Sequence, residues 1–300
     1  MSPMECQPDL NRFATLAEVE ELVACARRED LGPEARDLTS ELFIPGELRG
    51  VARFVARQAG CLAGAALLPV VMRHYDAGVT LEAPLADGSE LAAGSSIATI
   101  AGPMRSLLAL ERVALNFLTH LSGIASLTRR YVHLAAGHRA VICDTRKTLP
   151  GLRHLEKYAV VCGGGISHRM GLYDAVLIKD NHLAHLGLED LGQAVRLAVE
   201  RAKTARPAPA FVEVEVDSLA QLERVLASGA DMVLLDNMAP EQMVQAVQRR
   251  DRIRPGVLLE ASGGINLQTV RAIAESGVDR ISIGALTHSA PALDIGLDVV

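Results

Sequence analysis

From residue 140 onward, the chain alternates short apolar runs with amphipathic helical patterns. The apolar runs are rich in β-branched residues and occupy 140–144, 174–178, 211–216, 231–235, 257–261 and 279–283. Strands that alternate with helices form parallel sheets, because each helix carries the chain back to the start of the next strand. A complete α/β barrel has eight such units, and six are readable here. The pattern therefore predicts a parallel sheet that is open, or closed into a full or an incomplete barrel.

The first part of the chain follows a different pattern. Helical segments alternate with short strand-like runs that Gly and Pro punctuate, with helices at 15–29 and 65–75 and strands at 49–57, 79–83 and 96–101. Thr15 and Glu18 have the spacing of a capping box, which marks the start of the first helix. Together these features predict a small mixed α/β layer.

The segment 105–122 predicts one long helix that is apolar on more than one face. Such a helix is buried on several sides, between domains or between subunits. The last residues, 288–300, have no helix after them, and we expect them to return to the first domain. The 300 residues of the chain suffice for one large barrel or for two domains of unequal size.

Composition and charge narrow the classes of function. The net charge is −6, whereas proteins that bind nucleic acid normally carry a basic excess. No stretch approaches the apolar length of a transmembrane helix, and residues 1–12 lack the basic end and apolar run of a secretory signal. The five cysteines are scattered, odd in number and without metal-binding spacing. We therefore expect a cytoplasmic protein with reduced thiols that binds neither nucleic acid nor membrane.

Polar residues or glycines lie at or near the end of each predicted strand in the second part of the chain. Active sites of parallel barrels lie at the carboxyl ends of the strands, so these residues are the candidates for a site. They are Asp144-Thr145-Arg146-Lys147, Lys179-Asp180-Asn181-His182, Glu213 with Glu215, Asp236-Asn237, Ser262-Gly263-Gly264, and Gly284-Ala285.

Two glutamates interrupt the strand predicted at 211–216. Side chains alternate between the faces of a strand, so Glu213 and Glu215 share one face and the valines between them share the other. In a barrel covered by helices, the valines would pack outward and the glutamates would point inside, where carboxylates need cationic partners or a metal. Arg146, Lys147 and Lys179 are the available cations. The alternative is an edge strand with one solvent-exposed face.

Basic residues are concentrated between the first and second predicted strands, and they predict an anion site. They are Arg146, Lys147, Arg153, His154, Lys157, His168 and Arg169. The alternative is a solvated surface loop. The glycine-bearing turns at 262–265 and 282–285 suit a phosphate monoester, because their backbone N–H groups can donate to it.

The chain closely resembles the quinolinate phosphoribosyltransferases over nearly its whole length. The most specific match is DTRKTLPGLRHLEKYAVVCGGGISHRMGLYDAVLIKDNH at 144–182. Further matches lie at 29–40, 111–126, 212–216, 234–237, 260–265 and 281–298. The resemblance implies an N-terminal α/β sandwich domain at 1–125, completed by the tail 288–300, and an incomplete α/β-barrel catalytic domain at 126–287.

The reaction implied by the resemblance belongs to de novo NAD biosynthesis. A phosphoribosyl group passes from 5-phosphoribosyl 1-diphosphate to quinolinate with decarboxylation, which gives nicotinate mononucleotide, diphosphate and carbon dioxide. The family also implies magnesium as cofactor and a homodimer in which each active site is completed by the neighbouring subunit.

The family's site residues carry over to positions of this chain that match its motifs. Arg112 would be the residue donated across the dimer interface. Glu215 and Asp236 would face the ribose hydroxyls and the magnesium ion. The basic pocket for quinolinate and diphosphate would be formed by Arg146, Lys147, His168, Arg169 and Lys179. The 5-phosphate would be held by Ser262, Gly264 and Gly284. Among these residues, the catalytic ones would be Lys147, Lys179, Glu215 and Asp236.

Two positions depart from the family pattern. Ser167 stands where Asn is expected before the His-Arg pair, and Ser126 stands where Thr is common. Both keep a small hydrogen-bonding side chain, so they bear on substrate preference and not on the reaction.

Three alternatives differ in class or substrate. One is that the chain is among the transport-associated relatives in the same family and does not use quinolinate. A Schiff-base aldolase would use Lys179 as its nucleophile, and a catalytically silent sensor would bind a phosphosugar.

Overall fold

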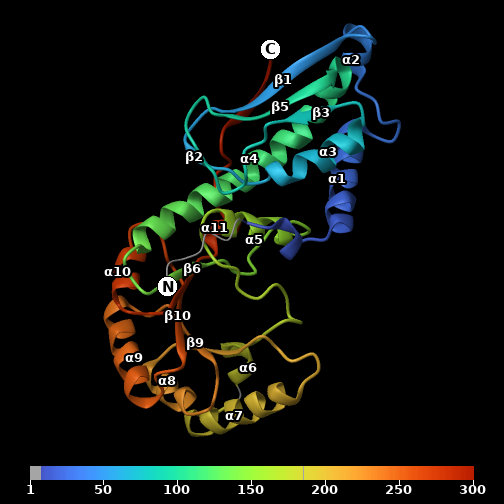
Figure 1. The fold of residues 1–300 in the computed structure, drawn as a ribbon. Helices are drawn as coiled ribbons and strands as arrows, with labels where there is room; N and C mark the ends of the chain where they lie inside the picture. Colours follow the sequence, from blue (N-terminus) through green and yellow to red (C-terminus); the bar gives the residue numbers. More distant parts are fainter. Residues whose placement is uncertain (1–7, 185) are drawn as a thin grey trace. The chain divides into compact units, whose positions relative to one another are not determined.

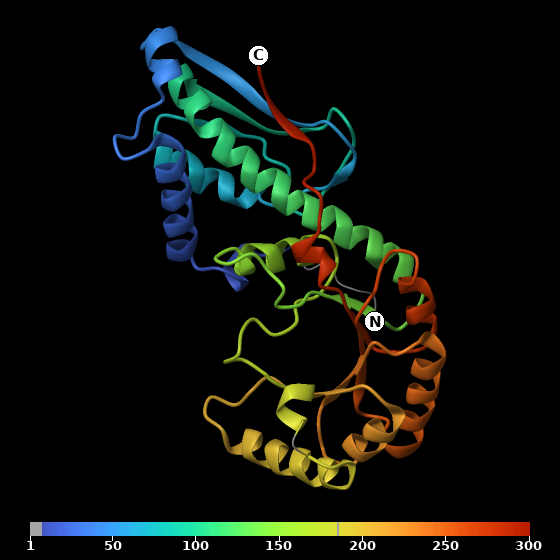
Figure 2. The same ribbon diagram turned by 180° about the vertical axis from the view of Figure 1, so that it is seen from behind.

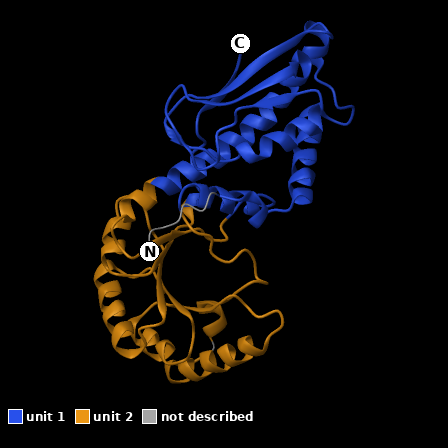
Figure 3. Cartoon of the chain, in the orientation of Figure 1, with its two compact units in different colours: residues 1–129, 148–164, 286–300 blue, residues 130–147, 165–285 orange. Residues whose placement is uncertain are grey.

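The computed structural model describes residues 8–184 and 186–300; Cys6 lies outside the described residues. The chain divides into two compact units (Figures 1 and 3). Unit 1 comprises residues 1–129, 148–164 and 286–300, and unit 2 comprises residues 130–147 and 165–285. None of the helices that the structure describes is both long and apolar enough to span a bilayer.

Unit 1 is built on a four-stranded antiparallel sheet in the order β12-β1-β5-β3. Its strands are β1 (Arg49–Ala56), β3 (Thr80–Glu82), β5 (Ser96–Pro103) and β12 (Ile295–Val299). The C-terminal strand pairs with β1 along its length, with Ala52 opposite Val299 and Ala56 opposite Ile295. This pairing confirms that the last residues return to the first part of the chain. A small second sheet pairs β2 (Gly60–Cys61) with β4 (Glu90–Leu91).

Helices cover one face of this sheet, as both ribbon views show (Figures 1 and 2). The helices of unit 1 are η1 (Leu10–Arg12), α1 (Leu16–Leu31), α2 (Leu38–Phe43), η2 (Ala65–Leu67), α3 (Leu68–Tyr75), α5 (Arg153–Cys162) and most of α4 (Met104–Ala135). Helix α1 begins with the predicted capping box, in which Thr15 N–H donates to Glu18 Oε2 at 2.7 Å and Glu18 N–H donates to Thr15 Oγ1 at 3.3 Å. The start of this helix was therefore predicted correctly.

Helix α4 (Met104–Ala135) is longer than the segment 105–122 predicted from apolar residues. Its side chains at Leu107, Leu110, Leu118 and Ile124 are completely buried, which confirms that it is buried over most of its length. Small side chains allow close packing here, since Ser122 Oγ accepts from Ala63 N–H at 3.0 Å.

Unit 2 contains a six-stranded parallel sheet in the order β6-β11-β10-β9-β8-β7. The strands are β6 (Val141–Cys143), β7 (Val176–Ile178), β8 (Val212–Val216), β9 (Met232–Asp236), β10 (Leu258–Ser262) and β11 (Arg280–Ser282). All six predicted strands are therefore present. Strands β6 and β7 follow one another in the chain but lie at opposite ends of this order, so the sheet is an incomplete barrel, as expected.

The helices of unit 2 lie along the outer side of this curved sheet (Figure 1). They are α7 (Leu188–Thr204), α8 (Leu219–Leu226), α9 (Pro240–Ile253) and α10 (Val270–Glu275). The short helices α6 (Asp180–Leu183) and α11 (Ala285–His288) follow β7 and β11. Val212, Val214 and Val216 are buried on strand β8. Because β8 pairs with both β7 and β9, the alternative of an edge strand is excluded.

The resemblance places a domain boundary after residue 125, but one later segment packs with unit 1. Residues 148–164 belong to unit 1, because α5 finds its polar partners there. Tyr158 Oη donates to Asp87 Oδ2 at 2.7 Å, and His120 Nε2 lies 2.9 Å from Glu156 Oε1. The basic residues of this segment also have local partners, since Arg153 Nε donates to Thr148 Oγ1 at 3.1 Å.

Candidate active site

The candidate residues of unit 2 follow successive strands of one parallel sheet. Arg146 and Lys147 come after β6, Lys179 follows β7 and Glu215 lies near the end of β8. Asp236 ends β9, Ser262 ends β10 and Gly284 follows β11. Because the strands are parallel, their carboxyl ends lie on the same rim of the sheet. The structure thus brings together the candidates that the sequence places in this unit.

Strands β8 and β9 bring two carboxylates together at this rim. Glu215 is paired in register with Leu234, two residues before Asp236. Burial raises the pKa of Glu215, the neighbouring Lys179 lowers it, and the charges of Asp236 and Asp180 raise it further. Lys179 Nζ lies 3.9 Å from Glu215 Oε2. The rim therefore holds three acidic groups beside one exposed lysine.

This acidic group fits a magnesium ion. Mg²⁺ prefers carboxylate and water oxygens and is commonly bound through one or two carboxylates together with substrate phosphates. Glu215 and Asp236 supply such oxygens from adjacent strands. Burial and, after it, the negative charges of Asp236 and Asp180 raise the pKa of Glu215, and a cation would relieve the repulsion between these charges.

Two arginines meet on the β6 side of the sheet. Arg169 is buried, and its guanidinium donates to Ala175 O at 3.2 Å. Burial lowers its pKa, and the positive charge of Arg146 lowers it further. Two guanidinium groups that repel each other in a partly buried place are stabilised by an anion between them. This pair is therefore a candidate site for a carboxylate or phosphate.

The segment after the triple glycine returns to β6 and places the His-Arg pair inside the unit. Ile166 forms a parallel bridge with Cys143, and its N–H donates to Ile142 O at 2.8 Å. His168 N–H then donates to Asp144 Oδ1 at 2.9 Å. This short extension of the sheet is what fixes His168 and Arg169 next to the end of β6.

A buried ionic cluster surrounds the His168 ring. His168 Nε2 lies 2.9 Å from Glu213 Oε2 and 3.5 Å from Glu260 Oε1. Both glutamates are fully buried. Burial raises the pKa of each to about 7, in Glu260 with a further contribution from the charge of Glu213. The close partner of Glu213 is therefore His168. Of the predicted cations Arg146, Lys147 and Lys179, only Lys179 affects the pKa of Glu213.

Glu260 and Arg280 were missed by the sequence-based reasoning as residues of this interior. They lie opposite each other on β10 and β11, and Arg280 lowers the pKa of both buried glutamates. The signal was present, since each is a charged residue within an apolar run. The alternation argument applied to Glu213 would have found Glu260 as well.

The glycine turn after β10 packs against the end of β9. Gly263 and Gly264 have positive φ angles of 95° and 62°, which only glycine adopts without strain. A side chain at Gly263 would collide with the Asn237 side chain, and Asn237 N–H donates to Ser262 O at 2.9 Å. Gly264 has open space around it, so its backbone can be approached closely by a ligand.

Arg112 is an exposed residue of helix α4 in unit 1. All other predicted site residues belong to unit 2.

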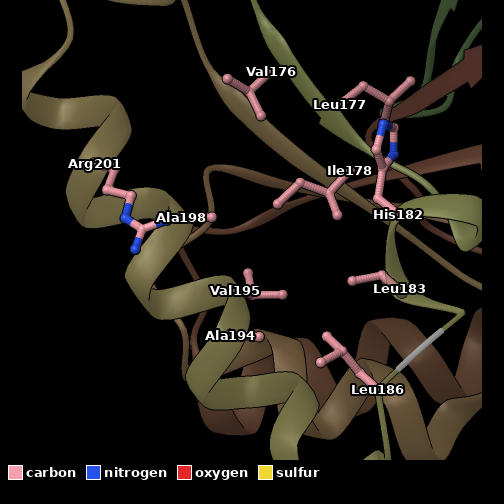
Figure 4. Close-up of a pocket in the computed structure, with 10 residues that line it drawn as sticks. All are labelled: Val176, Leu177, Ile178, His182, Leu183, Leu186, Ala194, Val195, Ala198 and Arg201. Atoms are coloured by element: carbon pink, nitrogen blue, oxygen red, sulfur yellow. The ribbon is translucent and has the colours of Figure 1, made fainter.

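A pocket of about 430 Å³ lies beside the site, between β7 and helices α6 and α7 (Figure 4). Its lining is aliphatic except for His182 and Arg201. His182 Nδ1 accepts a hydrogen bond from the Lys179 backbone N–H at 2.9 Å, so this ring holds the backbone of Lys179 in place after β7. The apolar walls suit neither a dicarboxylate nor a diphosphate.

Comparisons with known proteins agree along the chain. The family model described as quinolinate phosphoribosyl transferase, N-terminal domain, matches residues 37–122, and that described as the C-terminal domain matches residues 124–298.

Individual relatives extend this similarity. The nicotinate-nucleotide pyrophosphorylase (carboxylating) of Mycobacterium leprae is 44% identical over 266 residues, which cover 88% of this chain and 91% of that protein. The probable nicotinate-nucleotide pyrophosphorylase (carboxylating) of Bacillus subtilis is 42% identical over 272 residues, 90% of each. The solved structure of the nicotinate-nucleotide pyrophosphorylase from Francisella tularensis superposes with a TM-score of 0.86 at 36% identity, covering 96% of this chain and 98% of that one. The chain therefore belongs to the quinolinate phosphoribosyltransferase family.

Proposed function

We propose that this chain transfers a phosphoribosyl group from 5-phosphoribosyl 1-diphosphate to quinolinate and releases diphosphate and carbon dioxide, giving nicotinate mononucleotide. The observation that carries the proposal is the rim of the parallel sheet, where buried and exposed cations face a pair of carboxylates. In a chain of net charge −6, this local basic group matches two polyanionic substrates. Family membership supports the same reaction.

The two carboxylates of quinolinate match the cations on the β6 side of the rim. Arg146 and Arg169 lie close enough for one charge to lower the pKa of the other, and a guanidinium binds a carboxylate through two parallel hydrogen bonds. Lys147 follows Arg146 directly and is exposed. We assign the pyridine dicarboxylate to this basic group, in which we also include His168.

The phosphoribosyl donor matches the remaining part of the rim. Ser262 ends β10, and Gly264 and Gly284 lie in the turns after the last two strands, which is where barrels commonly bind phosphate. Glu215 and Asp236 would face the ribose hydroxyls and hold magnesium. Bound magnesium would neutralise the diphosphate and so stabilise it as a leaving group.

The first chemical step breaks the bond between the anomeric carbon and the diphosphate. The bonding electrons leave with the diphosphate, and the ribose carbon becomes positively charged. Glu215 and Asp236 provide negative charge at the same rim, which stabilises such a cation. The pyridine nitrogen, held by the cations on the other side, then donates its electron pair to that carbon.

The second step releases carbon dioxide. The pyridinium formed in the first step withdraws electrons from the ring, so the bond between the ring and its 2-carboxylate can break with its electron pair staying on the ring carbon. That carbon then takes up a proton. Lys179 is the candidate donor, since its side chain is 47% exposed and its ammonium lies at the rim beside Glu215.

The same lysine argues against a Schiff-base aldolase. A lysine that forms Schiff bases is desolvated or placed next to another cation, whereas Lys179 is exposed and lies 3.9 Å from a carboxylate oxygen.

We further propose that the chain acts as a cytoplasmic homodimer in which Arg112 of one subunit completes the site of the other. Arg112 is exposed on a helix that buries its neighbours Leu110, Val113 and Leu115, which supports a role outside its own unit. The four cysteines that the structure describes are free, as expected of a reducing compartment.

An assay of the purified protein tests the proposed reaction. Quinolinate, phosphoribosyl diphosphate and Mg²⁺ are combined, and nicotinate mononucleotide and carbon dioxide are followed over time. We expect product only when all three are present. A folded protein that gives no product from quinolinate but accepts another pyridine or pyrimidine acid would place the chain with the transport-associated relatives.

A further inference from the structure

We propose that Glu213 and Glu260 are positioning residues that act through His168 to hold Arg169 in its substrate-binding place. The inference rests on the proposed function, in which Arg169 binds a carboxylate of quinolinate. Neither glutamate reaches the open rim, since both are completely buried.

His168 is tied to three different strands. Its backbone N–H donates to Asp144 Oδ1, just after β6, at 2.9 Å. Its Nε2 lies 2.9 Å from Glu213 Oε2 on β8 and 3.5 Å from Glu260 Oε1 on β10. The ring also packs edge-on against Phe211, with 5.3 Å between ring centroids. Because the restraints come from separate strands, the imidazole cannot rotate without disturbing the barrel interior.

The hydrogen bonds of the ring settle its tautomer and connect it to Arg169. Arg169 N–H donates to His168 Nδ1 at 2.7 Å, so Nδ1 is an acceptor and the proton lies on Nε2. Nε2–H then donates to Glu213. The position of the ring therefore fixes the backbone N–H of Arg169, the residue whose guanidinium binds the substrate in the proposed function.

Glu213 also acts on the charge of Arg169. The positive charge of Arg146 disfavours the charged form of Arg169, and the negative charge of Glu213 favours it. Glu213 thus offsets part of the repulsion between Arg146 and Arg169 while no anion is bound between them. The Glu213 carboxylate therefore acts on Arg169 in two ways: it holds the backbone in place through His168, and it favours the charged guanidinium.

Burial without full hydrogen bonding indicates that stability alone does not explain these carboxylates. Glu213 Oε1 has no hydrogen-bond partner among the described residues, and an unpaired buried carboxylate oxygen is costly. Apolar residues of similar size are often at least as stabilising as buried ion pairs. Buried polar atoms without hydrogen-bond partners concentrate at functional sites.

The ligand atoms of these three residues lie within 4.8 Å of one another, a spacing that would also admit a metal ion. We favour positioning because Nε2, the ring nitrogen that faces the carboxylates, carries the proton and so cannot coordinate. Metal analysis of the purified protein separates the two. One tightly bound transition metal per chain, lost in Glu260→Gln, would overturn the positioning role.

The main test is steady-state kinetics of Glu213→Ala and Glu213→Gln. We expect Glu213→Ala to raise the KM for quinolinate about tenfold or more, which corresponds to the loss of one good polar contact, with the KM for phosphoribosyl diphosphate changed less than about twofold. Glu213→Gln retains an acceptor for Nε2–H, so it should recover a large part of the quinolinate KM. Glu260→Ala should give a smaller shift in the same direction, since its distance to Nε2 is longer.

Asp279→Asn is the matched control. Asp279 is a buried carboxylate beside the same sheet, and its Oδ2 accepts from Arg250 at 2.6 Å. Asp279→Asn should lower the melting temperature without changing the KM for quinolinate or for phosphoribosyl diphosphate. Glutamate variants that behave like this control, or that raise both KM values equally, would overturn the inference. A wild-type protein without activity would overturn the proposed function itself, and this inference with it.

Discussion

Two glutamates on one face of one strand have different environments. Glu213 is sealed inside unit 2, whereas the Glu215 side chain keeps 15% of its surface exposed. The two-residue step along β8 moves a carboxylate by about 7 Å, from the barrel interior to the rim. We therefore assign positioning to the inner residue and chemistry to the outer one.

Lys147 is the residue whose loss should affect the reaction most directly. Removing a cation that holds a substrate carboxylate where charge changes in the reaction typically lowers turnover by about 100-fold or more. We expect Lys147→Ala to lower kcat by at least that factor. Lys203→Ala, which changes an exposed lysine of α7, should leave kcat unaffected. Near-normal turnover of Lys147→Ala would remove this lysine from the mechanism.

Glu260 should make the stability of the protein depend on pH. Burial and the charge of Glu213 raise its pKa from 4.5 to about 7, against opposing effects of His168 and Arg280. The folded protein therefore holds a proton that the unfolded chain has already released. The stability associated with that proton is complete below pH 4.5 and is lost as the pH rises to about 7.

Glu260→Gln is neutral throughout this range and isolates the effect. Relative to the wild type, we expect the variant to become more stable between pH 5 and 7, by at most about tenfold in the unfolding equilibrium constant per pH unit. Urea unfolding at a series of pH values measures the difference. A difference that does not vary with pH would show that Glu260 titrates alike in the folded and unfolded chains.

At the scale of elements, the sequence patterns predicted what local chemistry determines. The six apolar runs became the six strands, and the Thr15–Glu18 spacing became a capping box. Pro240 occupies the first position of α9, where its fixed φ suits a helix start. Asn266 caps the turn that leads into α10, where its Oδ1 accepts from Gln268 and Thr269 N–H at 2.9 and 3.1 Å.

What the patterns did not predict depends on contacts between distant segments. The order of the strands places β6 and β7 at opposite ends of the sheet, although they are consecutive, and no local signal encodes this. Residues 148–164 pack in unit 1 through partners such as Asp87 and His120. The role of Glu260 depends on its burial beside His168, which a charged residue in an apolar run only suggests.

Helix α4 offers a test of burial at the element scale. Leu118 is completely buried, whereas Leu134 on the same helix is 36% exposed. Leu118→Ala should destabilise the protein by about 2 kcal/mol or more, because it removes buried methyl groups and leaves a cavity. Leu134→Ala should cost less than half of that. Equal losses in denaturant unfolding would mean that the apolar face of α4 does not determine its packing.

At the scale of the whole molecule, the proposed shared site joins Arg112 of one subunit to the rim of the other. Arg112 belongs to unit 1, and Lys147 belongs to unit 2. If the dimer shares its active sites, each complete site needs Lys147 from one subunit and Arg112 from the other. A pairwise complementation of two inactive variants distinguishes this arrangement from a site built within one chain.

The experiment co-expresses Arg112→Ala and Lys147→Ala subunits with different affinity tags and isolates the mixed dimer through both tags. One site of that dimer then contains both original residues, and the other contains both substitutions. Activity per dimer should return to about half of the wild-type value, as two-fold symmetry requires, although each variant alone is nearly inactive. A mixed dimer of Lys147→Ala with the double variant provides the control and should stay inactive. If the Arg112→Ala and Lys147→Ala pair also stays inactive, both residues act within one chain and the shared site is wrong.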